Sequence, residues 1–474
     1  MKGMLRADRF YIDGQWVEPS GSRSLAVIDP STEEAVGEVR LGGTADVEHA
    51  VAAARRAFPA FHRTTRADRL DLLRKILAVY RTRQDEIAAL LPCEMGATAG
   101  VARAQAAGGA AHIEKTIAAL ETFPFEEQKG SALVIREAIG VCGMISPWNN
   151  PVPQLITKAV PAMAAGCTTI SKPSELAPFA ASIVAEIMHE AGVPNGVFNL
   201  LHGDGFTVGA ALAAHPGIDM IAFTGSLSAG IAVAKAAADT VKRVHQELGG
   251  KSANIILEDA DLERAVRGGV SGCFFLAGQT CGAPSRMFVP EYLLGEVVAI
   301  ARDAAERIKV GPPEDRDTDI GPLISKAQFA RVQRYIRSGI DEGAMLVAGG
   351  LGRPESLARG YYCRPTVFAH VTPGMTIARE EIFGPVLSIL TYANEEDVIR
   401  LANDSDYGLV GYVQSADRER GLRVAREIRT GYVSVNYPPL NIDVPHGGYR
   451  RSGNGRQWAE YGIADYLEYK ALVG

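Results

Sequence analysis

The stretch IGVCGMISPWNNPVP, from Ile139 to Pro153, contains a short apolar run followed by a proline-rich turn. The apolar run predicts a buried strand, and the turn separates it from the segment that follows. The same order recurs: further strands are expected at CTTIS (167–171), GVFNLL (196–201) and MIAFTG (220–225), with a helix over 180–191. This alternation is typical of a parallel, doubly wound α/β sheet, which binds ligands at the carboxyl ends of its strands.

A second α/β region is expected after ELGGKSANIILEDAD (247–261). Its first helix has apolar residues at helical spacing, namely Leu262, Val266, Val270 and Phe274. Another helical pattern opens at Thr65. The segments SALVIREA (131–138) and GIADYLEYKALVG (462–474) contain strand-like alternation, and both could form free sheet edges that pair with partners.

Composition excludes several classes of protein. The chain has 474 residues, 47% of them hydrophobic and 22% charged, with a net charge of −6, as in a soluble globular protein of two or three domains. The basic cluster at Arg450, Arg451 and Arg456 is too small for a nucleic-acid footprint. We find neither a signal-like N-terminus nor a run approaching about 18 apolar residues, so we expect a cytoplasmic protein without a membrane span.

The six cysteines are scattered through the chain without a CxxC pair: Cys93, Cys142, Cys167, Cys273, Cys281 and Cys363. This spacing predicts free thiols in a reducing compartment, with neither a disulfide framework nor a metal site.

One of these cysteines lies in an unusual setting. In LAGQTCGAPS (276–285), Cys281 is surrounded by small residues, whereas a structural cysteine usually packs among aliphatic ones. Two interpretations remain open from this loop alone. The small residues serve a tight turn, or they leave room for another molecule to reach the sulfur.

Two further segments could bind a nucleotide. FTGSLSAG (223–230) lies between a strand and a helix, where backbone N–H groups bind phosphates, although Gly225 and Gly230 do not form the GxGxxG pattern. In KPSE (172–175), Lys172 and Glu175 could bind ribose hydroxyls, and a carboxylate there would repel a 2′-phosphate. The alternative for KPSE is an ordinary helix start capped by Ser174.

Two polar residues at strand ends are candidates for catalysis. Glu247 of ELGGK is either a satisfied structural group or a base with a raised pKa. Asn149 of PWNNP is either a turn asparagine or a fixed amide that stabilises an oxyanion.

Taken together, PWNNP, KPSE, FTGSLSAG, ELGGK, GQTC and EEIFGP resemble the aldehyde dehydrogenase superfamily, in the order expected and over essentially the whole chain. The resemblance implies an α/β fold with a parallel-sheet dinucleotide-binding domain (1–118 and 138–248) and an α/β catalytic domain (249–448). It also implies a small β oligomerisation arm (119–137 and 449–474), and therefore a homo-oligomer, either a dimer or a tetramer.

The resemblance further implies an NAD(P)-dependent, hydrolytic reaction on an aldehyde. Cys281 would attack the carbonyl to give a thiohemiacetal, and Asn149 with the Cys281 N–H would hold its oxygen. After hydride transfer, Glu247 would activate the water that hydrolyses the thioester. NAD is expected in preference to NADP because of Glu175. The implied cofactor contacts are Trp148, Lys172, Ser174, Glu175, Gly225, Ser226, Gly230, Leu248, Glu381 and Phe383.

Departures from the family pattern concern the substrate. Polar residues replace common aromatic ones, and the expected pocket residues are Asn150, Gln154, Thr157 and His446, with Phe275 as an apolar wall. They suggest a bulky, aromatic or polar-ended aldehyde, and the alternative is drift in a loosely specific pocket. Gln457 replaces a glutamate that relays protons in many relatives. Because a glutamine side chain does not titrate, the sequence does not show how the proton leaves the site, and Lys158 and Glu460 are candidates for this step.

Rival functions use the same thiol. A coenzyme-A-dependent acylating enzyme would not need Glu247 as a hydrolytic base. A thiol esterase would need Cys281 without NAD, and a catalytically silent binding protein would need none of the three residues Asn149, Glu247 and Cys281.

Overall fold

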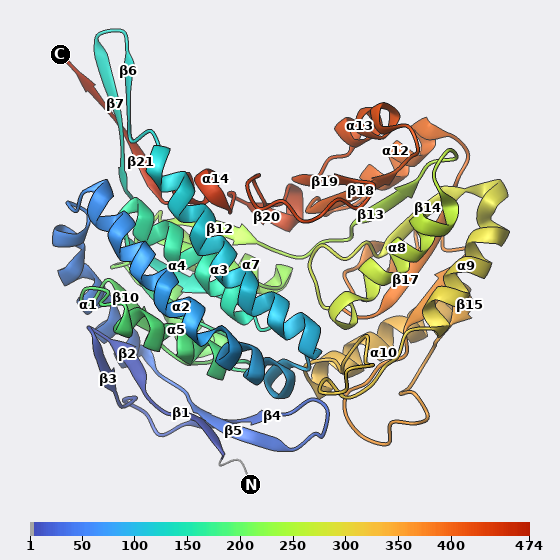
Figure 1. Ribbon diagram of the computed structural model, residues 1–474, viewed down its shortest axis with the longest axis horizontal. Coiled ribbons are helices and arrows are strands. Elements are labelled where there is room, and N and C mark those ends of the chain that lie inside the picture. Colours follow the sequence, from blue (N-terminus) through green and yellow to red (C-terminus); the bar gives the residue numbers. More distant parts are fainter. Residues whose placement is uncertain (1–3) are drawn as a thin grey trace.

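The computed structural model describes residues 4–474, so residues 1–3 of the first predicted domain lie outside the described part. Figure 1 shows two α/β units side by side, with a narrow β arm projecting from one of them. The expected α/β fold class is confirmed, and the sheets of both units are largely parallel.

The first unit is built on an eight-stranded sheet. In spatial order its strands are β20 (Gly453–Asn454), β12 (Arg243–Glu247), β11 (Met220–Thr224), β8 (Val141–Ile145), β9 (Thr168–Lys172), β10 (Phe198–Leu200), β2 (Phe10–Ile12) and β3 (Gln15–Val17). The five strands from β12 to β10 run parallel, while β20, β2 and β3 are antiparallel additions at the edges. The carboxyl ends of the parallel strands therefore meet at one edge of the sheet.

Helices cover both faces of this sheet. One face carries α2 (Arg66–Met95), α3 (Ala99–Thr122), α4 (Pro151–Ala165), α5 (Phe179–Glu190) and α14 (Ala459–Asp465). The other carries α1 (Thr44–Phe61), the π-helix η1 (Gly205–Gly209), α6 (Ala210–Ala214) and α7 (Leu227–Ala238). The helical pattern expected at Thr65 is α2, where Thr65 caps the N–H of Asp68 and Gly96 ends the helix at φ 76°.

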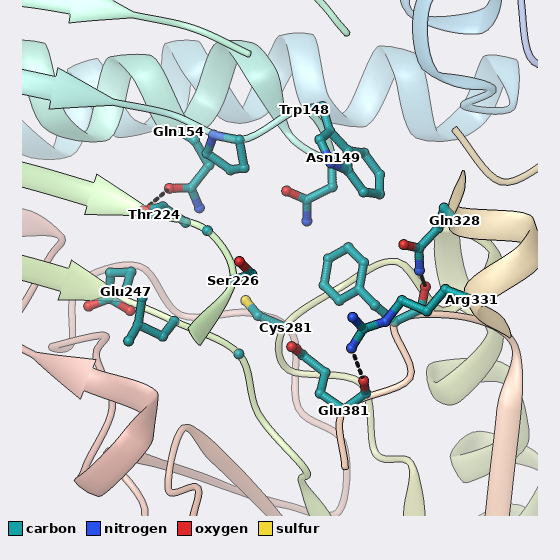
Figure 2. Close-up of a pocket in the computed structure, with 15 residues that line it drawn as sticks. Trp148, Asn149, Gln154, Thr224, Ser226, Glu247, Cys281, Gln328, Arg331 and Glu381 are labelled. Carbon is teal, nitrogen blue, oxygen red and sulfur yellow. Dashed lines mark hydrogen bonds between the residues drawn. The ribbon is translucent and has the colours of Figure 1, made fainter. Parts of the chain in front are cut away.

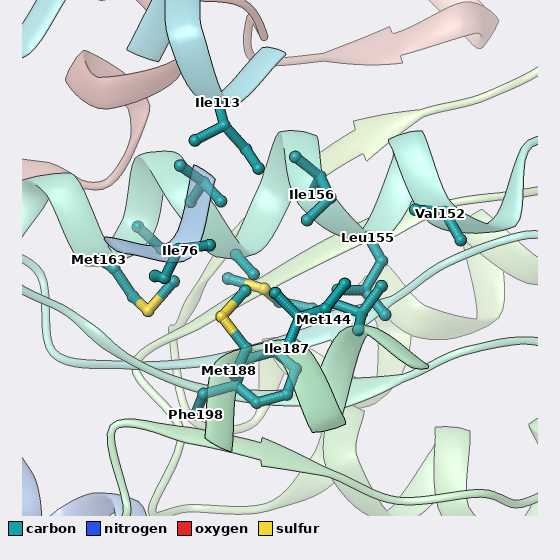
Figure 3. Packing of buried hydrophobic residues seen from close by; sticks show 14 of the residues in the cluster. Ile76, Ile113, Met144, Val152, Leu155, Ile156, Met163, Ile187, Met188 and Phe198 are labelled. Carbon is teal, nitrogen blue, oxygen red and sulfur yellow. The ribbon is translucent and has the colours of Figure 1, made fainter. Parts of the chain in front are cut away.

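Helix α4 is the centre of the first core. Nearly all of its side chains are buried, because α2 and α3 cover one side of it and the sheet with α5 covers the other. Figure 3 shows Leu155, Ile156 and Met163 of α4 between Ile76 and Ile113 on one side and Met144 and Met188 on the other. This packing fixes the N-terminus of α4, which lies directly after Asn149 and Asn150.

The second unit contains a seven-stranded sheet. In spatial order its strands are β15 (Met345–Ala348), β16 (Thr366–Ala369), β17 (Val386–Tyr392), β14 (Arg286–Pro290), β13 (Ala253–Ile256), β18 (Val410–Gln414) and β19 (Tyr432–Val435). All neighbours are parallel except β15. One face packs on α8 (Leu262–Phe274) and α9 (Leu294–Glu306), and the other on α10 (Lys326–Asp341), α11 (Thr376–Arg379), α12 (Glu395–Asn403) and α13 (Arg418–Glu427).

The arm is a three-stranded antiparallel sheet in the order β21 (Leu467–Val473), β7 (Ala132–Ala138) and β6 (Glu126–Lys129). The expectation that both 131–138 and the tail are free edges is wrong for the first segment, because β7 lies between β6 and β21 and pairs with both. The remaining short elements are β1 (Leu5–Ala7), β5 (Ala35–Arg40) and β4 (Ser24–Ile28), which form a separate small sheet, and the 3₁₀ turns η2 (Phe275–Gly278), η3 (Glu291–Leu293) and η4 (Arg450–Ser452).

The domain boundaries stay a prediction, and the elements cross some of them. Helix α3 continues to Thr122, past the expected boundary at residue 118. The segment 449–474 supplies not only β21 of the arm but also β20 of the first sheet and α14 of its helical layer.

Candidate active site

A cavity of about 170 Å³ lies where the carboxyl ends of the first sheet face the second unit. Figure 2 shows the side chains around it, with Cys281 in the middle, Asn149 above it, and Glu247 and Glu381 to either side. The lining residues are Pro147, Trp148, Asn149, Gln154, Thr224, Gly225, Ser226, Glu247, Leu248, Gly249, Cys281, Gln328, Arg331, Glu381 and Phe383. Residues of PWNNP, FTGSLSAG, ELGGK, GQTC and EEIFGP, which are far apart in sequence, therefore surround one space.

The loop that carries Cys281 is held in an unusual backbone conformation. Leu276, Ala277 and Gly278 have φ values of 52°, 53° and 71°, and left-handed residues other than glycine cost about 1–3 kcal/mol each. The Gln279 side chain holds the loop by accepting a 3.0 Å hydrogen bond from the N–H of Ile324. Strain of this kind is kept where a particular geometry is needed, here directly before the thiol.

Glycine lets the ELGGK loop approach the cysteine loop closely. A Cβ atom at Gly250 would lie only 2.6 Å from the carbonyl oxygen of Cys281. The small residues around Cys281 thus serve both a tight backbone contact and an accessible thiol, because Cys281 is partly exposed and lines the cavity.

Asn149 presents a fixed amide to the same space. Its Nδ2 donates a 3.0 Å hydrogen bond to the carbonyl of Gln279, two residues before Cys281. Its backbone carbonyl accepts a 3.0 Å hydrogen bond from Gln105, and proline at the first position of α4 fixes the start of the helix that follows. A preorganised amide of this kind can stabilise a developing oxyanion without reorganisation.

Glu247 ends β12 and is only 4% exposed. Its carboxylate oxygens have no hydrogen-bond partner among residues 4–474, but two imidazoles lie at ion-pair distances. His245 Nε2 is 3.4 Å from Oε1, and His446 Nε2 is 3.7 Å from Oε2. A buried carboxylate without hydrogen bonds is available to bind and deprotonate water.

The titratable groups of the site affect one another. Burial raises the pKa of the Cys281 thiol to about 12, and the carboxylates of Glu247 and Glu381 act in the same direction. Burial lowers the pKa of Lys158 to about 7, although Glu247 opposes this shift. The thiol is therefore protonated at neutral pH, and its activation requires a base or a cation nearby.

The EEIFGP loop closes the opposite side of the cavity. Glu381 Oε1 accepts a 3.1 Å hydrogen bond from Gly250 N–H, and the Phe383 ring meets Trp148 edge-on with centroids 5.5 Å apart. Two residues of α10 hold this loop, because Gln328 donates to the carbonyl of Phe383 and Arg331 to that of Glu381, both at 2.6 Å.

The FTGSLSAG turn contains the start of helix α7. Ser226 caps α7, and its hydroxyl accepts from the N–H of Ala229, so the N–H groups of the first turn face the cavity edge. Gly225, Ser226 and Leu248 line the cavity, whereas Gly230 lies inside α7, where a Cβ would meet Leu248 at 2.6 Å.

The KPSE residues lie further along the same sheet edge, after β9, and do not line this cavity. Lys172 Nζ is 3.1 Å from Glu175 Oε2. The alternative that Ser174 caps a helix is wrong, because α5 begins at Phe179 and Ser174 instead accepts the N–H of Leu176 in a local turn.

The expected substrate residues do not form one group. Gln154 lines the cavity, and its Oε1 accepts a 3.0 Å hydrogen bond from Lys158. Asn150 and Thr157 flank it on α4 without lining the cavity, and Asn150 Oδ1 is buried without a partner in the described part of the chain. Phe275 is 50% exposed and does not line the cavity. His446 does not line it either, and its ring stacks on that of Trp458 beside Glu247.

Four residues near the site are absent from the sequence-based candidates. Gln328 and Arg331 lie on a helix without a recognisable motif, so no local signal marks them. Asp465 lies 220 positions from His245, its hydrogen-bond partner. For His245 the sequence does offer a signal. Residues i and i+2 of a strand share a face, so His245 is expected on the same face of its strand as Glu247.

The family model for the aldehyde dehydrogenase family matches residues 16–472 of this chain. The chain belongs to the aldehyde dehydrogenase family. A Pseudomonas sp. 3-succinoylsemialdehyde-pyridine dehydrogenase is 52% identical over 98% of both chains.

Solved aldehyde dehydrogenase structures superpose closely. Aldehyde dehydrogenase C of Pseudomonas syringae, a cysteine-to-alanine variant in complex with NAD+ and octanal, matches with a TM-score of 0.97, 49% identity, and coverage of 98% of this chain and 96% of that one. An aldehyde dehydrogenase of Mycobacterium tuberculosis in complex with NAD+ matches with a TM-score of 0.97 and 40% identity over 99% of each chain. The family resemblance seen in the motifs is thereby confirmed.

Within 4–474, we find no helix with the length and apolar character needed to cross a bilayer. The same residues contain no group of three or more His, Cys, Asp or Glu side chains placed to hold a metal ion.

Proposed function

We propose that this aldehyde dehydrogenase oxidises a bulky, aromatic or polar-ended aldehyde to the carboxylic acid, with NAD as the preferred cofactor and Cys281 as the nucleophile. The observation that carries the proposal is the single cavity that brings Asn149, Glu247 and Cys281 together with the FTGSLSAG and EEIFGP loops. The alternatives explain fewer of these residues. A coenzyme-A-dependent acylating enzyme would not need Glu247 as a hydrolytic base, a thiol esterase would not need NAD, and a silent binding protein would need none of the three side chains.

The residues present fit a dinucleotide. The cavity edge offers the N-terminus of α7 to a phosphate, and the Glu381 carboxylate is available to hydroxyl groups. Lys172 and Glu175 at the next strand end would bind the adenosine ribose, and Glu175 would repel a 2′-phosphate. Bound NAD+ would supply the hydride acceptor for the oxidation, and two related aldehyde dehydrogenase structures were solved in complex with NAD+.

The side chains would then act in sequence. The Cys281 thiol would pass its proton to Glu247 and from there to solvent, and its sulfur would add to the aldehyde carbon. The Asn149 amide and the Cys281 N–H would bind the resulting oxyanion, a contribution of about 3 kcal/mol per donor. Loss of hydride leaves a thioester on Cys281. Glu247 would remove a proton from water, and the hydroxide would add to the acyl carbon. The C–S bond would then break, which releases the acid and returns the Cys281 thiolate.

Two observations support the proposed substrate class: polar side chains at the start of α4, and the aldehydes named for two related proteins. Asn150 and Thr157 take places where many family members carry aromatic residues, and Asn150 Oδ1 is buried without a partner within residues 4–474. Gln154 lies near them and lines the cavity. A pyridine-bearing semialdehyde is named for one relative and octanal for one solved neighbour, and both are larger than a short alkyl aldehyde.

The open edges of the arm support a homo-oligomer, either a dimer or a tetramer. The outer strands β6 and β21 have unpaired edges within the described chain, and Tyr469, Leu472 and Val473 expose apolar surface. Free thiols at all six cysteines fit a reducing compartment such as the cytoplasm.

The experiment that tests the proposal is an aldehyde panel of acetaldehyde, octanal and pyridine- or phenyl-bearing aldehydes, scored for NADH and NADPH formation. We expect kcat/KM with acetaldehyde to be the lowest, and Cys281→Ser to abolish NADH formation. Glu247→Gln should still release one equivalent of NADH and then turn over about 100-fold or more slowly. Wild-type turnover in Glu247→Gln, or acetaldehyde as the best substrate, would contradict the proposal.

A further inference from the structure

Alternation along β12 places His245 and Glu247 on the same face of the strand. His245 is 3% exposed on its side chain, and its two nitrogens face two different acids. Nδ1 lies 2.5 Å from Asp465 Oδ2 at the end of α14, and Nε2 lies 3.4 Å from Glu247 Oε1. The imidazole therefore stands between two carboxylates.

A buried carboxylate such as Glu247 requires a compensating charge to remain ionised. Of the cations nearby, Lys158 is already bound to Thr224 and Gln154 at 2.6 and 3.0 Å. His446 stacks on Trp458 at a centroid distance of 4.3 Å, and burial lowers its pKa. His245 differs from both, because a second carboxylate stabilises its charge.

The surroundings of the ring favour the imidazolium. Burial opposes the charge, but Asp465 and Glu247 together outweigh it and raise the pKa of His245 to about 9. The other groups facing it are polar but neutral or already paired: Gln457 lies 3.3 Å from Nε2, and Arg243 binds the carbonyls of Asp465 and Leu467 and the Glu468 carboxylate. A half-turn of the Gln457 amide would bring its unpartnered oxygen to the Nε2–H of the imidazolium.

The backbone at Gly455 packs closely on the His245 ring. A Cβ at Gly455 would lie 2.3 Å from Nδ1, and Gly455 has a φ of 80° that favours glycine. The ring is consequently held in the orientation that directs its nitrogens at Asp465 and Glu247.

We propose that His245, held as an imidazolium by Asp465, is a positioning residue that keeps Glu247 ionised and ready to act as the base of thioester hydrolysis. This inference rests on the proposed role of Glu247. When water gives a proton to Glu247, an O–H bond of water breaks, a carboxyl O–H bond forms, and the hydroxide adds to the acyl carbon. The C–S bond to Cys281 then breaks, and its electron pair stays on the sulfur as a thiolate. The imidazolium then disfavours the neutral carboxyl, so the proton passes to solvent and the carboxylate is restored. The same pair answers the question raised by Gln457, because no titrating side chain is needed at that position.

The test measures deacylation directly, as the decay of the octanoyl adduct on Cys281 by intact mass after mixing with NAD+ and octanal, from pH 6 to 10. Asp465→Asn keeps the shape of the side chain and leaves the backbone contacts of Arg243 intact. We expect it to form the adduct and NADH normally but to deacylate about tenfold more slowly at pH 7. In wild type and variant alike, the deacylation rate is expected to fall at acidic pH. In Asp465→Asn this fall should begin about one to three pH units higher, which is the usual effect of losing an opposite charge at this distance. His245→Gln should behave in the same way, and Asp465→Glu should restore the wild-type profile.

A matched control is available on the surface, where His215 pairs with Glu48 at 2.9 Å. His215→Gln removes the same type of pair and should leave the profile unchanged. If Asp465→Asn deacylates more slowly by the same factor at every pH, His245 and Asp465 have only a structural role, and the inference is overturned. If His245→Gln does not fold, the profile of Asp465→Asn decides. If Glu247→Gln deacylates at the wild-type rate, the proposed function itself fails. If Glu247→Gln deacylates slowly and Asp465→Asn deacylates at the wild-type rate, only this inference fails.

Discussion

The N–H of Gly250 donates a 3.1 Å hydrogen bond to Oε1 of Glu381 and so joins the ELGGK loop of one unit to the EEIFGP loop of the other. The contact is possible because there is no side chain at Gly249, where a Cβ would lie 2.1 Å from Oε2 of Glu381. Both loops line the cavity with Cys281, and the charge on Glu381 therefore matters for whatever binds there.

The affinity for NAD+ should depend on pH through Glu381. Burial raises the pKa of this carboxyl to about 7, so it is neutral below that pH and an ionised acceptor for hydroxyl groups above it. We expect the Kd for NAD+, measured by fluorescence titration, to fall as the pH rises from 6 to 8. Glu381→Gln should bind more weakly and lose this dependence, while Glu380→Gln at the exposed neighbouring position should keep it. An unchanged slope in Glu381→Gln would assign the pH dependence to another group.

Removal of the Asn149 amide should slow acylation. Asn149→Ala deletes a donor that the Gln279 carbonyl holds in place, and the loss of one oxyanion donor costs about 100- to 1,000-fold in rate. The burst phase of NADH formation reports this step. Asn149→Asp is the matched variant, since it keeps the shape but carries no N–H. An intact burst rate in both variants would exclude Asn149 from the stabilisation of the oxygen.

Glu175 should set the preference between cofactors. A carboxylate next to a 2′-phosphate would be strongly unfavourable, so Glu175→Gln should raise the ratio of kcat/KM for NADP to that for NAD by at least about tenfold. Glu190→Gln, an exposed carboxylate elsewhere on the same unit, serves as the control. If the ratio does not change, discrimination lies in another part of the site.

Gly278 should be essential for the conformation of the cysteine loop. Its φ of 71° disfavours other residues by about 1–2 kcal/mol, and a Cβ there would lie 2.2 Å from the carbonyl oxygen of Gly384. We expect Gly278→Ala to lower the free energy of unfolding by about 3 kcal/mol, as the clash adds to the strain. Gly343→Ala has a similar φ of 87° but meets nothing within 4 Å, so it isolates the backbone contribution. Equal urea midpoints for the two variants would show that the Gly384 contact is unimportant.

The strands β8, β9 and β11 and the helix α5 lie within a few residues of their predicted ranges, because apolar runs bounded by Gly and Pro are local signals. The middle position of β7 could not be predicted in this way. Its pairing with β21 joins residues more than three hundred positions apart, and no local pattern specifies that partner.

The same limit applies to the site. Cys281, Asn149 and Glu247 could be named as candidates because their motifs occur together in the order of one family, whereas each motif alone left two interpretations open. Gln328 and Arg331 act through backbone carbonyls of another loop, and any long polar side chain on an exposed helix looks the same in sequence. The exposed position of Phe275 follows from the left-handed turn after α8, which redirects the chain in a way that the helical pattern of α8 does not reveal.

Strand β20 pairs with β12 at Gln246 and Glu247, more than two hundred residues earlier in the chain, and the segment that follows it carries Asp465. During synthesis, the surroundings of Glu247 are therefore incomplete until the ribosome has passed that segment. On the proposed mechanism, a nascent chain that already contains the thiol loop would still lack residues around the base of thioester hydrolysis.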